Sequence, residues 1–133
     1  MAADFLTRQG LAASSSAIKL RNLRSTKLAE GRPDALIGSI TFREKSAVHN
    51  LFLVAEYKGE QWDLAISSYH VSKDPEDGTD NVEENFIDQL DLDADGVDEI
   101  VTISGYYESW DYTIYKAQQG TWKKVYQGGG GGC

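Results

Sequence analysis

The chain has 133 residues, of which 41% are hydrophobic, and it carries a net charge of −8. That length fits one domain with a real hydrophobic core, and the acidic balance argues against nucleic acid or anionic membranes as partners, because like charges repel. No stretch approaches the roughly eighteen consecutive apolar residues of a transmembrane helix, so the sequence predicts no membrane insertion.

Residues 1–32 make up a basic N-terminal segment with six basic and two acidic residues. Leu20, Leu23 and Leu28 recur at a partly helical spacing, which predicts a short helix over residues 17–29. We expect this helix to dock on the acidic remainder of the chain. An arm that binds a partner protein is the alternative.

Residues 33–127 make up a predicted β domain, because apolar residues there tend to recur at every second position. Strands are expected around the segments 40–42, 51–57, 62–68, 86–90, 100–107, 111–117 and 121–126. Tight turns are expected at 58–60 and 118–120, and a long exposed loop at 72–83. The expected fold class is all-β, with mostly antiparallel meanders in a sandwich or a partly closed barrel and one short N-terminal helix.

The most informative segment is an acidic run, since residues 74–99 include twelve acidic residues and no Lys or Arg. Asp91, Asp93 and Asp95 occupy alternate positions of this run and are followed by Gly96. Ca²⁺ takes six to eight oxygen ligands, and glycine permits the sharp bend that brings them together. Carboxylates about 5 Å apart repel by about 3 kcal/mol per pair at an effective dielectric of about 20. Without a cation, we expect the carboxylates of such a loop to move apart or to take up a proton.

The ligand set follows from a comparison of calcium-loop lengths. An EF-hand needs a bidentate Glu at its twelfth position and a helix after it, whereas this chain has Thr102 there and strand-forming residues beyond. A loop of nine positions would use the side chains of Asp91, Asp93, Asp95 and Glu99 and the backbone carbonyl of Val97. Asp98 competes with Glu99, but its side chain would leave the strand on the opposite face. Mg²⁺ fits less well because it requires a stricter octahedron, and a solvated acidic turn without an ion is the alternative.

The loop resembles the Asp-x-Asp-x-Asp-Gly-x-x-Asp loop of FG-GAP repeats, which occur in integrin alpha propellers and in bacterial secreted proteins. Here Glu99 stands in the closing position. The resemblance covers residues 90–104, lacks a Phe-Gly or Gly-Ala-Pro element, and is present in a single copy. It implies a calcium-stabilised strand-loop-strand unit in an extracytoplasmic or cell-surface bacterial protein, not a complete propeller. The chain starts without a recognisable secretory signal, which is consistent with that location if it is part of a longer secreted protein.

A second feature is the aromatic cluster of Tyr106, Tyr107, Trp110 and Tyr112, which is expected near the end of a hairpin. Exposed aromatic rings beside acidic residues bind sugar rings and anchor protein interfaces. A polysaccharide or a protein is therefore a possible partner of this cluster. The alternative is that the rings pack in the core and as cross-strand pairs.

No catalytic constellation stands out, and we expect the protein not to be an enzyme, with a hydrolase as the weakest alternative. His49 and His70 are the only imidazoles and fall on separate predicted strands, and acidic pairs arise by chance in so acidic a chain. Residues 128–133 are expected to form a flexible glycine tail that ends in the lone Cys133, so no internal disulfide is available. The sequence thus predicts a calcium-binding β domain with a structural or recognition role, Ca²⁺ as its cofactor, and an oligomeric state that stays open.

Overall fold

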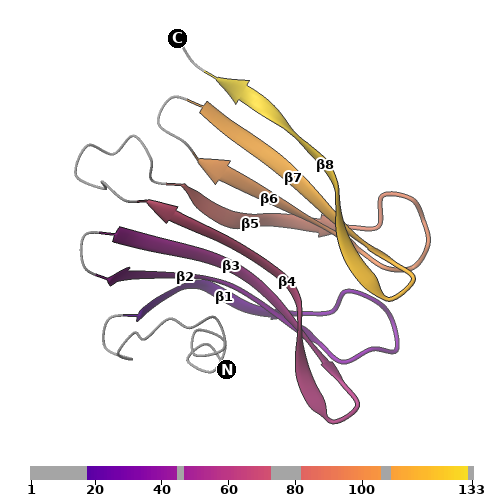
Figure 1. The fold of residues 1–133 in the computed structure, drawn as a ribbon. Helices are drawn as coiled ribbons and strands as arrows, with labels where there is room; N and C mark the ends of the chain where they lie inside the picture. Colours follow the sequence, from indigo (N-terminus) through magenta and orange to yellow (C-terminus); the bar gives the residue numbers. More distant parts are fainter. Residues whose placement is uncertain (1–17, 45–46, 73–81, 106–108, 132–133) are drawn as a thin grey trace.

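The computed structural model describes residues 18–44, 47–72, 82–105 and 109–131. These residues form eight strands in two four-stranded antiparallel sheets, each a meander in chain order (Figure 1). The first sheet consists of β1 (Ile18–Thr26), β2 (Ala35–Glu44), β3 (Ala47–Lys58) and β4 (Gln61–Ser72). The second consists of β5 (Glu83–Leu90), β6 (Glu99–Gly105), β7 (Ser109–Gln118) and β8 (Thr121–Gly131). The all-β prediction is confirmed, as two separate sheets and not as a closed barrel.

The hydrophobic core lies between the two sheets. Ile37 of β2 and Phe52 and Val54 of β3 form one buried cluster with Ile100 of β6 and Tyr115 of β7. Because successive side chains of a strand point to opposite faces, Phe52 and Val54 line the same face of β3. Removing such apolar surface from water contributes about 25 cal/mol per Å². This shared core makes the two sheets a face-to-face pair.

The predicted helix over residues 17–29 is wrong, because most of this segment is strand β1, paired with β2 from Ile18 to Thr26. The ladder shifts register between Arg21 and Arg24, and Asn22 has a positive φ of 54°. Such a β-bulge adds a residue to one strand and breaks its period of two. The spacing of Leu20, Leu23 and Leu28 therefore departs from the period of a strand and resembles that of a helix. No helix occurs among the described residues, and hence none that could span a membrane.

The remaining predicted strands and both predicted tight turns are present, while most of the loop expected at 72–83 lies outside the described residues. The predicted boundaries need two corrections. Residues 18–26 of the basic segment belong to the first sheet, and β8 continues through Gly131 into the expected glycine tail. At Gly129 a Cβ atom would collide with the backbone carbonyl oxygen of Trp110, so only glycine fits this position of the strand pair.

The two sheets repeat one architectural unit. In each sheet an eight-residue loop joins the first two strands, closed by the pair Thr26↔Ala35 in the first sheet and by Leu90↔Glu99 in the second. Figure 1 shows both loops at the same end of the molecule. Each position of the 27–34 loop thus corresponds to the position 64 residues later. A register shift then follows in the first strand pair of each sheet.

The second halves of the two units match as well. The pair Leu36↔Ala55 corresponds to Ile100↔Tyr115, so each position of β3 corresponds to the position 60 residues later in β7. Both final hairpins turn through two residues with positive φ, and both ladders shift register after the fourth pair from the turn. The chain therefore contains this unit twice, although only its second copy carries the acidic loop.

Candidate metal centre

The acidic loop, residues 91–98, joins β5 to β6 and is folded by its own carboxylates. The backbone N–H groups of Asp95 and Gly96 donate to the Asp91 carboxylate at 3.0 and 2.8 Å. The N–H of Val97 donates to Asp95 Oδ1 at 2.9 Å. Ala94 and Gly96 both adopt positive φ, at 61° and 90°. These side chain to backbone bonds curl the loop so that its acidic residues converge.

Four carboxylates converge at this loop: one oxygen each from Asp91, Asp93, Asp95 and Glu99 lies within 4.8 Å of the others. Oxygens that bind one Ca²⁺ at about 2.3–2.6 Å are at most about 5 Å apart, so the spacing suits a single ion. The three aspartates are exposed, whereas the Glu99 residue is only 3% exposed. The arrangement is therefore open to solvent on one side and closed by β6 on the other.

Glu99, not Asp98, is the fourth member of the cluster, as the sequence predicted from strand geometry. The Glu99 Oε2 atom accepts a 2.6 Å hydrogen bond from the backbone N–H of Leu92. Asp98 instead accepts a 2.9 Å bond from the Gln89 side chain and lines a pocket to which none of the four clustered carboxylates contributes. Val97 forms an isolated bridge with Ala29, and the role predicted for its carbonyl stays a prediction.

The electrostatics of the cluster disfavour a full set of negative charges. Burial raises the pKa of the Glu99 carboxyl above its usual range, the bond from Leu92 opposes this, and the charges of Asp95 and Asp91 raise it further. The neighbouring strand β7 provides one positive charge, since the Lys116 ammonium pairs with Asp93, Asp95 and Glu99. Four acidic groups therefore face one basic group, and the site favours additional positive charge.

The prediction from the sequence did not include Lys116 in this site. It lies 21 residues after Asp95, and only the pairing of β6 with β7 brings it there. A weak signal existed, because Lys116 is the only basic residue in the predicted strand 111–117. Residues that contact each other across two strands can be far apart in the sequence, so their spacing does not reveal the contact.

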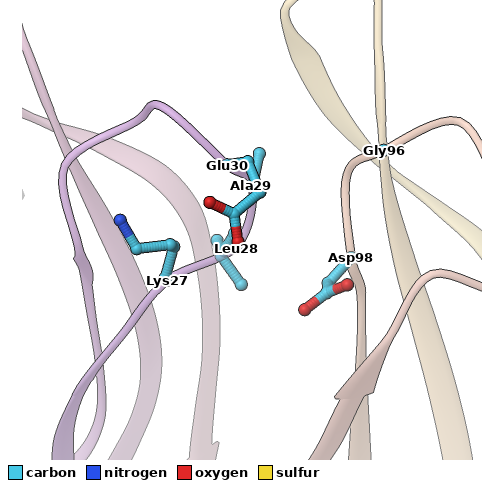
Figure 2. Close-up of a pocket in the computed structure, with 6 residues that line it drawn as sticks. All are labelled: Lys27, Leu28, Ala29, Glu30, Gly96 and Asp98. Carbon is cyan, nitrogen blue, oxygen red and sulfur yellow. The ribbon is translucent and has the colours of Figure 1, made fainter.

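The acidic loop also contacts the matching loop of the first unit, residues 27–34. The N–H of Asp98 donates to the carbonyl of Leu28 at 2.8 Å. Figure 2 shows the pocket between the two loops, of about 220 Å³, with Lys27, Leu28, Ala29 and Glu30 facing Gly96 and Asp98. None of the four clustered carboxylates lines this pocket. A backbone hydrogen bond therefore joins the two loops, and the carboxylate cluster is not part of the pocket between them.

The aromatic residues predicted as a ligand site are only partly described, since Tyr106 and Tyr107 lie outside the described residues. Trp110 and Tyr112 lie on one face of β7, 42% and 41% exposed. Their partners across the ladder are Gly130 and Gly128. The Trp110 indole lies 3.3 Å from the Cβ position of Gly130, so the ring covers the glycine strand.

His70 does not form a nucleophilic relay with Ser68 and Glu84. His70 Nε2 lies 3.4 Å from Ser68 Oγ and 3.8 Å from Glu84 Oε1. A serine relay needs the base and the orienting acid on different ring nitrogens, whereas both groups face the same one here. His49 packs on Phe42 with ring centroids 4.5 Å apart and contacts the Tyr69 hydroxyl.

The donor set of the acidic cluster is entirely oxygen, contributed by one loop and the first residue of the following strand. Hard cations prefer such donors, whereas structural zinc sites and copper sites rely mainly on nitrogen and sulfur ligands. Comparison of the chain with protein-family models, with curated proteins and with solved structures gave no match.

Proposed function

We propose that residues 91–99 bind one Ca²⁺ ion and that this ion stabilises the β domain, with no catalytic step. The observation that carries the proposal is the convergence of four carboxylate oxygens within 4.8 Å. The Val97 carbonyl is the proposed fifth ligand, and water would complete the coordination. The repeated four-stranded antiparallel unit is also the build of a propeller blade. A relation to FG-GAP repeats, and the extracytoplasmic location that it would imply, are part of this proposal.

Calcium fits the site better than magnesium. Three of the four carboxylates belong to exposed aspartates of a loop, and Ca²⁺ accepts irregular coordination by six to eight oxygens. Mg²⁺ demands a near-ideal octahedron and retains its water. Exposed sites of extracellular modules bind calcium in the range of roughly 0.1–1 mM, and we expect an affinity in that range.

The proposed role of the ion is to join strands and loops. It would connect the end of β5 to the start of β6 through residues of one loop. The bond between Asp98 and Leu28 extends that connection to the first sheet. At ten times its dissociation constant, an ion that binds only the folded state adds about 1.4 kcal/mol to the free energy of unfolding.

Calorimetric titration and thermal unfolding with CaCl₂ and MgCl₂ test this proposal. We expect heat on adding calcium and a rise in melting temperature of about 5 °C, with a smaller response to magnesium. Asp93→Asn should remove most of both effects. The control Asp63→Asn removes the same charge from a residue of β4 outside the cluster and should behave like the parent. No heat and no thermal shift with the parent protein would overturn the proposal.

A polysaccharide is the second candidate ligand, and the exposed aromatic face of β7 and β8 favours it. Trp110, Tyr112 and Tyr126 are 42%, 41% and 53% exposed and lie on one face of the second sheet. Glycines beside them let the rings lie flat, and flat rings stack on sugars. Trp110→Ala should lose retention on a polysaccharide column without a change in melting temperature. Equal retention of variant and parent would contradict this reading.

A further inference from the structure

The Lys116 ammonium pairs with three of the four carboxylates that would bind a metal ion. Its Nζ atom pairs with Asp93 and lies 3.4 Å from Asp95 Oδ2 and 3.9 Å from Glu99 Oε1. These three carboxylates belong to the set whose oxygens lie within 4.8 Å of one another. An ion bound by these carboxylates would therefore compete with the ammonium group for them. A strand 21 residues away from Asp95 in the chain contributes this charge.

The first unit of the chain provides an internal comparison. At the positions of the four acidic ligands it has Lys27, Ala29, Gly31 and Ala35, by the register of the two ladders. At the position of Lys116 it has Glu56, by the matching registers of β3 and β7. Glu56 accepts a 2.7 Å bond from the Trp122 indole N–H. The lysine therefore accompanies the acidic loop and is absent from the unit whose loop has no acidic residues at these positions.

We propose that Lys116 is an intramolecular counter-ion that an incoming divalent cation displaces, so that this lysine sets the affinity of the site. The inference rests on the proposed calcium binding and adds its regulation. Without the ion, the ammonium neutralises part of the repulsion among the carboxylates and keeps the loop folded. With the ion, the flexible lysine side chain moves away from the acidic oxygens. The ion pairs that are lost reduce the net gain from binding, so the site responds only at high calcium concentration.

Calorimetric titration of Lys116→Met with CaCl₂ tests the displacement. We expect binding about tenfold tighter than in the parent, because a network of ion pairs no longer has to be broken. The matched control is Lys124→Met, which removes the same charge from β8. Lys124 bonds Gln127 at 3.3 Å and makes no ion pair with the cluster among the described residues. Its affinity for calcium should stay within about twofold of the parent.

The parent protein itself gives a second measurement, which does not depend on how the variant folds. In NMR spectra of the parent, the ε-methylene resonances of Lys116 should shift and sharpen as calcium is added. Those of Lys124 should stay in place. Thermal unfolding of Lys116→Met should begin from a lower melting temperature without calcium and show a larger rise with it.

The outcomes separate the two proposals. No calcium heat with either protein would overturn calcium binding itself, and the displacement with it. Equal affinities of parent and Lys116→Met, with no movement of the Lys116 resonances, would overturn only the displacement and leave the calcium site standing. Weaker calcium binding by Lys116→Met would show that the lysine supports the bound state, and this result would also overturn the displacement.

Discussion

At the scale of single residues, the buried Glu84 carboxylate shows how hydrogen bonds outweigh burial. Glu84 is 4% exposed, and its Oε2 atom accepts bonds of 2.7 Å from both Thr102 and Tyr115. Burial alone would raise its pKa, but bonds from His70, Ser68, Thr102 and Tyr115 lower the pKa to about 2. Burial raises the pKa of Tyr115, and the contact with the charged Glu84 raises it further. Glu84 is therefore a buried charged group, and the hydrogen bonds that it accepts stabilise the folded state.

This lowered pKa predicts the acid stability of the protein. A carboxylate whose pKa falls on folding adds stability that is complete above its unfolded value of 4.5. That stability is lost as the pH falls toward about 2, and its size is about 3 kcal/mol. Glu84→Gln should lower the free energy of unfolding at pH 7 by about 2–3 kcal/mol and flatten its decline between pH 4.5 and 2.

Urea unfolding at a series of pH values measures this effect. The control is Glu83→Gln, since the neighbouring Glu83 side chain is 43% exposed and pairs with Arg21. Exposed ion pairs contribute at most about 1 kcal/mol. An equal loss of stability in the two variants would contradict the role assigned to Glu84.

At the scale of structural elements, the acidic loop depends on two residues with left-handed backbone. Gly96 has a φ of 90°, and nothing lies within 4 Å of its Cβ position. Ala94 has a φ of 61° in the same loop. A side chain at such an angle costs about 1 kcal/mol, whereas glycine adopts it freely. The loop thus contains one position that suits glycine and one strained position.

The two positions predict opposite effects of substitution. Gly96→Ala should lower the free energy of unfolding by about 1 kcal/mol, and Ala94→Gly should raise it by about 0.5 kcal/mol. Urea unfolding in the presence of a chelator measures both effects without a contribution from calcium. Because no neighbouring atom would clash with the added methyl group at 96, the loss reports the backbone alone. Changes of the same sign in the two variants would contradict this account of the loop.

At the scale of the whole molecule, the two repeated units share one core and should unfold together. Phe52 of β3 is 1% exposed, and its ring lies 6.2 Å from that of Tyr115 in the other sheet. Truncating a buried phenylalanine removes its contacts and leaves a cavity. The consequences should therefore reach both sheets.

Phe52→Ala should lower the free energy of unfolding by about 3–5 kcal/mol. Amide hydrogen exchange should accelerate in β6 and β7 as much as in β2 and β3, because the units form one cooperative structure. The control Ile87→Ala truncates a side chain on β5 that is 44% exposed and should cost far less. Faster exchange confined to the first sheet would show that the units unfold independently.

Local patterns in the sequence were sufficient where the structure depends on neighbouring residues. Alternating apolar residues predicted β2 to β8, and the glycine-containing turns at 58–60 and 118–120 predicted two hairpins. The alternate spacing of Asp91, Asp93 and Asp95 before Gly96 predicted the convergence of carboxylates, because that geometry arises within a few bonds of the chain. Strand alternation also chose Glu99 over Asp98.

The remaining features depend on contacts between distant segments, which no local pattern reports. The bulge at Asn22 disguised β1 as a helix, and only pairing with β2 decided its conformation. Lys116 reaches the acidic cluster through the pairing of β6 with β7. The repetition of the four-stranded unit appears in the registers and bulges, while few side chains recur between its copies. The sequence by itself therefore determined the strand periodicity and the acidic loop. Only the tertiary structure decided what lies across from each residue, since ladder register follows from packing of the two sheets as a whole.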